Sequence, residues 1–341
     1  MGAKILVTGG LGYIGAHTCV SLIEKGYEPL VIDNLSESDY EVKGRIEKIT
    51  GRELLFEPIE MCNLQELDGV FQRNPDISGV IHFAAFLLVN ESVDDPLKYY
   101  ENNLISTMNL LKCMEKYSVA PIVFSSSCTV YGNPDVLPVG ENAPVKEAES
   151  PYGNTKKIGE DILKDFSKVS GVNVISLRYF NPIGAHESSI IGEFQDGEPH
   201  HLVPYITETA VGKRAKLRVF GGDYNTRDGS CVRDYIHVVD IADAHILAVQ
   251  RLIDGRSEGD FEVFNLGSGD GFTVLEMINV FESSTGISIE YELVDRRPGD
   301  VEAVYADISK ARNILGWEPK RSLEEMLSSA WNFEEALKKQ E

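Results

Sequence analysis

The sequence predicts an α/β protein built on a Rossmann-type, doubly wound parallel sheet, with a smaller α+β domain toward the C-terminus. Three observations support this prediction. Short β-branched runs alternate with longer amphipathic segments up to about residue 180. The runs are continuously apolar, as strands covered on both faces are. A glycine-rich turn joins the first expected strand to the first expected helix, which is the arrangement of nucleotide-binding βαβ units.

The expected elements follow one another from the N-terminus. Strands rich in Val, Ile and Leu are expected at residues 4–9, 29–33, 79–85, 121–127 and 173–180. Helices are expected to begin near Tyr13, Asp39, Leu64, Pro96 and Pro151. Beyond residue 180 the alternation loosens into stretches rich in Gly, Asp and Pro, so we expect two domains, 1–180 and 181–341. A helix within residues 238–250 and other C-terminal segments are expected to pack back on the sheet.

Composition narrows the classes of partner and compartment. The formal net charge of the 341 residues is −22 and no basic run offsets it, which argues against nucleic acid and anionic membranes as partners. The five cysteines are widely spaced without a CxxC pair, which favours a reducing compartment over a disulfide framework. No apolar run reaches the length of a membrane span. We therefore expect a cytoplasmic protein.

The glycine turn predicts a dinucleotide site. Gly9, Gly12 and Gly15 in "VTGGLGYIG" lie between an expected strand and an expected helix. Such glycines permit a tight turn, a close approach of backbone to pyrophosphate and close packing of the helix. Asp33 ends the second strand, where a carboxylate binds the ribose hydroxyls of NAD and repels the extra phosphate of NADP. A loop that merely contains glycines is the alternative.

A tyrosine and a lysine in "SPYGNTKK" suggest a general base. Ser150 and Pro151 suit the start of a helix, so Tyr152 and Lys156 lie one turn apart on one face. A neighbouring ammonium favours the phenolate and acts to lower the pKa of Tyr152. An adjacent oxidised nicotinamide would add a second positive charge, and we expect the two charges together to let the phenol take a hydroxyl proton. The alternative is a solvated pair, since the chain has 14 tyrosines and the spacing also arises by chance.

Two hydroxyl side chains stand at the end of the strand "PIVFSSS". Ser127 and Thr129 fall at the carboxyl edge of the sheet, where ligands of open α/β sheets bind. Both are candidates to hydrogen-bond the substrate hydroxyl that is oxidised. Capping of the chain as it leaves the sheet is the alternative.

From end to end, the chain resembles the extended short-chain dehydrogenase/reductase family, and within it the UDP-glucose 4-epimerases. The resemblance rests on the ordered segments "VTGGLGYIGAHT", "FSSSCTVYG", "SPYGNTK", "LRYFNPIGAH", "VRDYIHVVDIADAH" and "RRPGDV". It implies an isomerase that epimerises C4 of UDP-glucose and UDP-galactose reversibly through a 4-keto sugar. NAD is the implied cofactor, because it acts as the electron sink, and no metal is expected.

The resemblance also assigns residues to each part of the site. The implied catalytic residues are Tyr152, Lys156 and Ser127. The implied cofactor-binding residues are Gly9, Gly12, Tyr13, Ile14, Gly15, Asp33, Asn34, Glu60, Met61, Phe83, Ala84, Ala85, Asn102, Ser125, Tyr152, Lys156 and Tyr179. The implied substrate-binding residues are Ser127, Thr129, Tyr152, Tyr179, Phe180, Asn181, His201, Leu202, Phe220, Arg233, Arg297, Asp300 and Val304.

Six positions depart from the epimerase pattern, and two of them, Phe86 and Leu88, stand where small residues are usual. Leu87 stands where a lysine normally binds the cofactor, so we expect weaker NAD retention or slower hydride transfer. Glu60 replaces an aspartate. His201 replaces an asparagine, and neither it nor its neighbour His200 has the companion ligands of a metal site. Val304 replaces a bulky tyrosine, which predicts activity on UDP-GlcNAc and UDP-GalNAc as well.

Other functions remain open at this point. A 4,6-dehydratase would carry an acid pair where this chain has Cys128 and Thr129. An epimerase for another UDP-sugar, such as a UDP-pentose, fits the unusual segment 86–90. A non-catalytic NAD-sensing protein is the alternative from another class, with Leu87 as its best support. The apolar stripes of residues 96–117 and 152–169 predict a homodimer, although they could also face the sheet.

Overall fold

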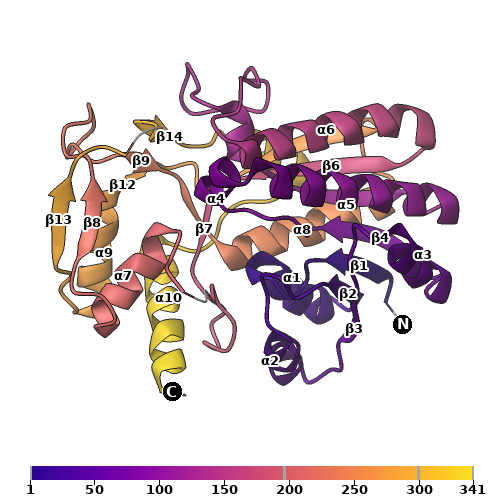
Figure 1. Ribbon diagram of the computed structural model, residues 1–341, viewed down its shortest axis with the longest axis horizontal. Coiled ribbons are helices and arrows are strands. Elements are labelled where there is room, and N and C mark those ends of the chain that lie inside the picture. Colours follow the sequence, from indigo (N-terminus) through magenta and orange to yellow (C-terminus); the bar gives the residue numbers. More distant parts are fainter. Residues whose placement is uncertain (1, 195–196, 298–299, 340–341) are drawn as a thin grey trace.

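A seven-stranded parallel sheet forms the centre of the computed structural model, which describes residues 2–194, 197–297 and 300–339. Its strands run in the order β11, β6, β5, β4, β1, β2, β3 (Figure 1). The bounds are β1 Lys4–Thr8, β2 Glu28–Asp33, β3 Leu55–Pro58, β4 Ile77–His82, β5 Pro121–Ser127, β6 Asn173–Tyr179 and β11 Phe261–Leu266. The order reverses between β1 and β4, so the carboxyl ends of these strands border the position where such sheets bind ligands.

Helices cover both faces of this sheet. The helices are α1 Tyr13–Glu24, α2 Glu41–Thr50, α3 Leu64–Arg73, α5 Pro96–Tyr117, α6 Pro151–Ser170 and α8 Val238–Ile253. Ile5 and Val7 face the cluster that includes α1 and α8, whereas Leu6 faces the cluster of α3, α5 and α6. Successive residues of one strand are thus buried on opposite faces, which explains its continuous apolar run. The predicted fold class is confirmed.

A smaller unit holds most of the remaining elements, at the opposite side of the molecule from α3 (Figure 1). Its strands are β7 Asn181–Ile183, β8 Leu217–Phe220, β9 Val232–Arg233, β10 Tyr235–His237, β12 Phe272–Thr273, β13 Tyr291–Val294 and β14 Ala303–Val304. Its helices are α7 Leu202–Val211, α9 Val274–Thr285 and α10 Leu323–Lys338. These helices share a separate apolar cluster with β8 and β10.

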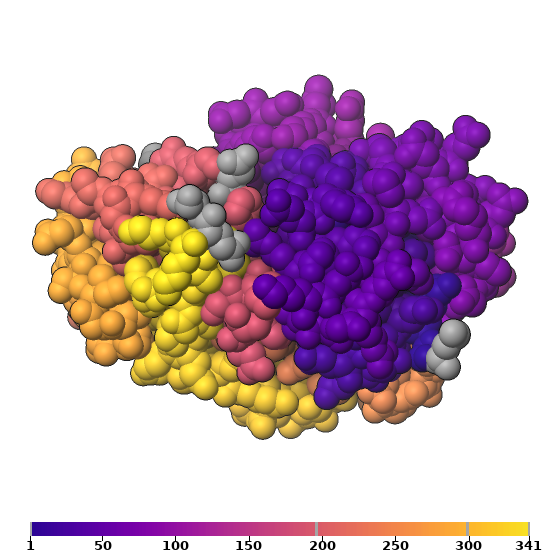
Figure 2. Space-filling view, turned by 90° about the horizontal axis from the view of Figure 1, so that it is seen from below, coloured from indigo at the N-terminus to yellow at the C-terminus, as the bar shows by residue number. Residues whose placement is uncertain are grey.

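Some C-terminal segments return to the large sheet. Helix α8 packs against β4, β5 and β6, and β11 adds the seventh strand beside β6. In the space-filling view, indigo N-terminal residues fill one side and most orange and yellow residues the other (Figure 2). The domain boundary near residue 180 stays a prediction.

Several elements escape the sequence prediction. The short strand β3 and the returning strand β11 were not expected, nor were helix α4 Val89–Asp94, the 3₁₀ turn η1 Cys128–Tyr131 and the π-helical turn η2 Ala311–Leu315. The helix predicted near Asp39 begins at Glu41. Among the residues described, no helix has the length and apolarity to cross a membrane.

Candidate active site

The glycine turn between β1 and α1 has the tight geometry that its sequence predicts. Gly9 has a φ of +66°, and a Cβ there would lie 2.8 Å from the backbone nitrogen of Ala84. A Cβ on Gly15 would lie 2.3 Å from the carbonyl oxygen of Gly9. A Cβ on Gly12 would meet only the Gly9 oxygen, at 3.4 Å. The backbone at Gly12 is therefore open to a ligand, and the alternative of an incidental glycine loop is disfavoured.

Asp33 connects this turn to the end of β2. Its carboxylate accepts hydrogen bonds from the backbone nitrogens of Leu11 at 3.2 Å and Leu35 at 3.0 Å, and from Ser38 Oγ at 2.9 Å. A carboxylate has about four acceptor positions, so one remains for a ribose hydroxyl. Beside it, Asn34 Nδ2 donates to Glu60 Oε2 at 2.8 Å.

These residues fit NAD. Tyr13 and Ile14 are the first residues of α1, so their backbone N–H groups have no partner within the helix and lie at the positive end of its dipole. Phe83, Ala84 and Ala85 follow β4 directly, at the switch point of the sheet. The site thus offers donors for a pyrophosphate and a carboxylate for a ribose.

Tyr152 and Lys156 lie on the first turns of α6, as predicted. Ser150 caps this helix by accepting from the backbone nitrogen of Gly153 at 3.1 Å. Lys156 is buried, and its Nζ donates to the carbonyl oxygen of Ser125 at 2.8 Å. The same Nζ lies 5.8 Å from the centre of the Tyr152 ring. At the end of β5, Ser127 Oγ accepts from the backbone nitrogen of Thr129 at 3.2 Å.

In the protein alone, the neighbouring ammonium does not lower the pKa of Tyr152 below its usual value. Burial raises the pKa of Tyr152 to about 12, although a hydrogen bond with Ser127 acts in the opposite direction. Burial also lowers the pKa of Lys156 to about 8. Desolvation disfavours the charged form of both groups, and it outweighs the opposing effects of Ser127 on Tyr152 and of Glu160 on Lys156. An acidic phenol therefore requires further positive charge, which a bound oxidised nicotinamide would supply.

Tyr179 is the last residue of β6 and lies beside Ser127, the last residue of β5. Its hydroxyl lies 2.6 Å from Nε2 of His245, whose Nδ1 lies 2.8 Å from the carbonyl oxygen of Ile241. The carbonyl can only accept, so Nδ1 carries the proton and Nε2 accepts from Tyr179. The ring of Phe83 lies 4.7 Å from the ring of His245. Tyr179 is thus held in one orientation.

The predicted nucleotide residues gather in the smaller unit. Arg297 Nη2 donates to Asp300 Oδ1 at 2.9 Å, and Arg233 Nη2 lies 3.5 Å from the same oxygen. The Arg297 guanidinium lies 5.4 Å from the centre of the Phe220 ring. Nearby along β7, Asn181 Nδ2 donates to the backbone oxygen of Asp234 at 2.7 Å. Two cations therefore converge on one carboxylate beside an aromatic ring.

Other predicted residues have different surroundings. Met61 and Phe180 are buried in apolar clusters, and Leu202 is the first residue of α7. His201 Nδ1 lies 2.6 Å from Glu193 Oε1. Burial would lower the pKa of His201, but the Glu193 carboxylate raises it above the usual value.

The structure also places Leu87 and Val304, which depart from the family pattern, and Asn102, which is predicted to bind the cofactor. Leu87 is 48% exposed. Val304 is buried and pairs with Arg233 in strand register. Asn102 on α5 donates to Asn103 Oδ1 at 3.0 Å.

Among the residues described, no group of three or more His, Cys, Asp or Glu side chains is arranged to hold a metal ion.

Sequence reasoning missed the residues that support the site from behind. Asn103 binds both backbone groups of Phe86 and donates to Thr155 on α6 at 3.0 Å. Glu160 and His245 were also missed. Their partners lie far away in sequence, so no local motif marks them.

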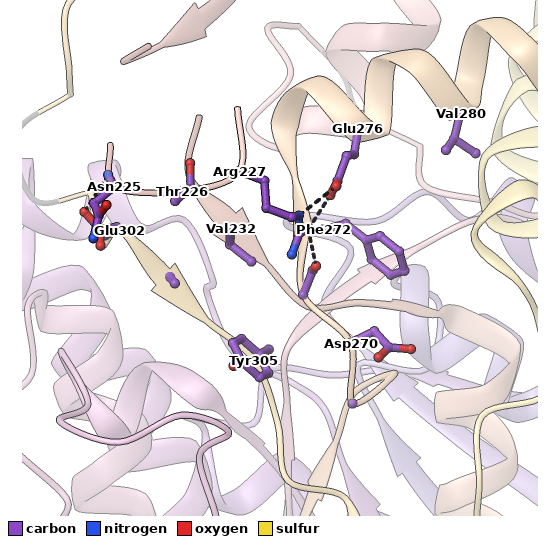
Figure 3. Close-up of a pocket in the computed structure, with 13 residues that line it drawn as sticks. Asn225, Thr226, Arg227, Val232, Asp270, Phe272, Glu276, Val280, Glu302 and Tyr305 are labelled. Atoms are coloured by element: carbon purple, nitrogen blue, oxygen red, sulfur yellow. Dashed lines mark hydrogen bonds and ion pairs between the residues drawn. The ribbon is translucent and has the colours of Figure 1, made fainter. Parts of the chain in front are cut away.

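A separate cavity of about 690 Å³ lies against the three-stranded sheet formed by β12, β9 and β14 (Figure 3). Val232 and Ala303 line it, and they are followed along β9 and β14 by Arg233 and Val304. Since alternate residues of a strand face opposite sides, the cavity and the predicted nucleotide residues lie on opposite faces of β9 and β14. The cavity contains none of the predicted site residues.

The chain is similar to proteins of known activity over nearly its whole length. A family model described as GDP-mannose 4,6 dehydratase matches residues 6–330. A UDP-glucose 4-epimerase of Bacillus subtilis is 49% identical over 97% of this chain and 96% of the relative. One from Dictyostelium discoideum is 47% identical over 97% of this chain and 95% of the relative.

Solved structures agree with these relatives. A UDP-glucose 4-epimerase of Stenotrophomonas maltophila, with bound NAD and formylated UDP-arabinopyranose, matches with a TM-score of 0.96 and 42% identity over 99% of this chain and 100% of that one. One from Bifidobacterium longum, in complex with NAD⁺ and UDP, matches with a TM-score of 0.92 and 43% identity over 98% of both chains.

Proposed function

The chain belongs to the UDP-glucose 4-epimerases of the extended short-chain dehydrogenase/reductase family, and from this premise we propose the residues and the substrate range of its reaction. The reaction is the NAD-dependent, reversible epimerisation of C4 between UDP-glucose and UDP-galactose. When bound, NAD supplies the hydride acceptor that makes the 4-keto sugar accessible. The observation that carries the assignment of the site is the convergence of Tyr152, Lys156 and Ser127 at the carboxyl end of β5.

Each catalytic side chain has a distinct role. Tyr152 takes the proton of the sugar 4-hydroxyl as that carbon is oxidised, and it returns a proton to the same oxygen when the 4-keto sugar is reduced from its opposite face. Lys156, fixed by Ser125 at 2.8 Å, favours the phenolate through its charge. Ser127 hydrogen-bonds the hydroxyl that reacts. Cys128 and Thr129 follow this serine, so the site has no acid pair there for the elimination that a dehydratase performs.

Binding energy concentrates on the nucleotide so that the keto sugar can turn over in its site. Arg233 and Arg297 supply charge-assisted hydrogen bonds to the diphosphate. Asp300 holds both arginines in place before substrate arrives. Local cations of this kind are needed because the whole protein has a net charge of −22.

Direct separation of products tests this function. Purified protein is incubated with NAD and, one at a time, UDP-glucose, UDP-GlcNAc and a UDP-pentose, and the C4 epimers are separated by chromatography. We expect UDP-galactose from UDP-glucose. The UDP-pentose reaction is a second candidate because the similar Stenotrophomonas structure holds a UDP-arabinopyranose derivative. Turnover of the pentose alone would replace the hexose assignment.

Val304 sets the size of the sugar pocket. Wild-type protein is expected to convert UDP-GlcNAc as well as UDP-glucose, because valine leaves room for an acetamido group. Val304→Tyr should reduce kcat/KM for UDP-GlcNAc at least tenfold and leave UDP-glucose turnover within about twofold, since a lost fit of 1.4 kcal/mol is a factor of ten. Ala303→Tyr is the matched control, because Ala303 lines the cavity on the other face (Figure 3). Equal losses in both variants would refute this role.

Leu87 weakens the hold on NAD. Leu87→Lys is expected to restore a charge-assisted hydrogen bond worth about 1.5–3 kcal/mol, and so to tighten NAD roughly ten- to a hundredfold. The measurement is NAD content after gel filtration, together with Kd by calorimetry. Val93→Lys, at a neighbouring position that is 60% exposed, adds the same charge to the surface. Equal retention in wild type and Leu87→Lys would reject the hypothesis.

The protein acts as a homodimer through α5 and α6. These helices pack side by side (Figure 1), and Leu97, Ile105 and Met108 expose apolar side chains on α5. Light scattering after gel filtration should give twice the chain mass of 37.8 kDa. Ile105→Glu combined with Met108→Glu should give the monomer mass. A wild-type monomer at micromolar concentration would contradict the proposal.

The enzyme works in the cytoplasm. Its five cysteines are all free in the structure, which suits a reducing compartment.

A further inference from the structure

A buried carboxylate lies directly behind the proposed catalytic pair. Glu160 is on α6, one helical turn after Lys156, and is 6% exposed. Residues four apart on a helix are neighbours on its surface. The negative charge of Glu160 acts on the Lys156 ammonium and raises the pKa of Lys156 against the larger lowering effect of burial.

Glu160 also joins three elements at the level of the site. Its Oε1 accepts from Ser126 Oγ on β5 at 2.6 Å and from Ser176 Oγ on β6 at 2.8 Å. Arg178 on β6 binds both carboxylate oxygens, at 2.9 Å and 2.6 Å. Ser126 stands between Ser125, whose carbonyl oxygen binds Lys156, and Ser127. The carboxylate therefore holds the strand end that carries both of these contacts.

The buried ion pair of Glu160 and Arg178 is expensive in desolvation free energy, which suggests that it serves more than stability. Burying an ion pair costs several kcal/mol in desolvation, and apolar replacements are often as stable. A pair that only fastened α6 to the sheet could be apolar. A carboxylate beside a buried lysine has an additional effect, because it favours the charged form of that lysine.

We propose that Glu160 is a positioning residue for the epimerase reaction: it fixes the end of β5 and supplies the negative charge that maintains Lys156 as an ammonium. The inference rests on the proposed roles of Tyr152 and Lys156.

The other ionisable groups around Lys156 supply no negative charge beside its ammonium. His82 on β4 interacts with the Lys156 charge, but burial lowers the pKa of His82 to about 3, so it is neutral. Burial keeps Tyr152 protonated in the protein alone. Arg178 is positive and binds Glu160, and its guanidinium lies 4.8 Å from the centre of the Tyr131 ring. Among these groups, Glu160 supplies the negative charge.

The test compares two matched variants. Glu160→Gln removes the charge behind Lys156. Glu262→Gln removes the same charge from a second buried pair, in which Arg251 binds Glu262 at 2.8 Å and 2.9 Å on α8 and β11. The alkaline limb of kcat/KM against pH should move down by about one pH unit in Glu160→Gln, the usual effect of one close charge. It should stay in place in Glu262→Gln. If the alkaline limb of kcat/KM lies at the same pH in both variants, the proposal is overturned.

A second readout is independent of turnover. NMR titration of ¹³Cε-labelled lysine, with the Lys156 signal identified by its loss in Lys156→Met, measures the Lys156 pKa without substrate. The pKa should fall in Glu160→Gln and match wild type in Glu262→Gln. This result stands even if the purified protein epimerises none of the UDP-sugars, so failure of the proposed function and failure of this inference are distinguishable. An unchanged Lys156 pKa in Glu160→Gln would overturn the role of the charge.

A milder variant covers the case in which Glu160→Gln does not fold. Ser126→Ala removes the contact between the carboxylate and β5 but leaves the charge. We expect kcat to fall about five- to tenfold, the effect of one lost hydrogen bond of roughly 1 kcal/mol, while the alkaline limb stays at the wild-type pH. A wild-type kcat in Ser126→Ala would overturn the positioning role.

Discussion

Tyr152→Phe is expected to lower kcat for UDP-glucose by about 10²–10⁴-fold, the usual contribution of a positioned general base. The substitution removes one oxygen atom from the start of α6 and leaves the ring. The cap formed by Ser150 and the contact of Lys156 with Ser125 do not involve that oxygen. The fold and the nucleotide site should therefore be unchanged.

Binding of UDP separates a catalyst from a sensor. Calorimetry should give the same UDP affinity for wild type and Tyr152→Phe, because the proposed UDP residues, Arg233, Arg297 and Asp300, lie in the smaller unit. A non-catalytic NAD-sensing protein would show no turnover in either form. Turnover in Tyr152→Phe within about tenfold of wild type would remove Tyr152 from the mechanism.

Lys156→Met is expected to lower kcat by about 10²-fold or more and to make the protein more stable. The lysine is 5% exposed, and burial lowers its pKa to about 8 from the usual 10.5. Below pH 8 the ammonium is charged in both the folded and the unfolded states, so its burial opposes folding by roughly 3 kcal/mol. Methionine removes that cost and loses one hydrogen bond to Ser125. A net gain of about 1–3 kcal/mol follows.

The pH dependence of this gain has a definite sign. As the pH rises through 8, the folded protein releases the lysine proton before the unfolded chain does, so the cost of burial fades toward pH 10.5. Urea unfolding at several pH values should show Lys156→Met most stabilised below pH 8 and close to wild type near pH 10. A destabilised variant at pH 7 would show that the ammonium supports the fold more than its burial costs.

Local patterns explain which parts of the site were predictable. The glycine turn, the Ser150 cap and the pair formed by Tyr152 and Lys156 are each contained within a few consecutive residues. Their geometry follows from backbone constraints and helix periodicity, and the structure places them at the expected ends of β1 and β5. The position of Asp33 follows similarly from the end of a strand.

The missed features depend on contacts between distant segments. Strand β11 joins the sheet only through β6, and Glu160 acquires its role from Ser126, Ser176 and Arg178. The raised pKa of Tyr152 in the protein alone could not be predicted, because a helix wheel shows a neighbouring charge but not the depth of burial. Desolvation is a property of the folded protein, and it decides the sign.

The central claim is that C4 is epimerised by reversible oxidation, and isotope transfer tests it most directly. UDP-glucose carrying deuterium at C4 is incubated with the purified protein and NAD in ordinary water, and the product is analysed by NMR and mass spectrometry. Epimerisation by reversible oxidation predicts UDP-galactose that retains deuterium at C4. UDP-galactose with hydrogen at C4, or recovery of UDP-glucose alone, would contradict it.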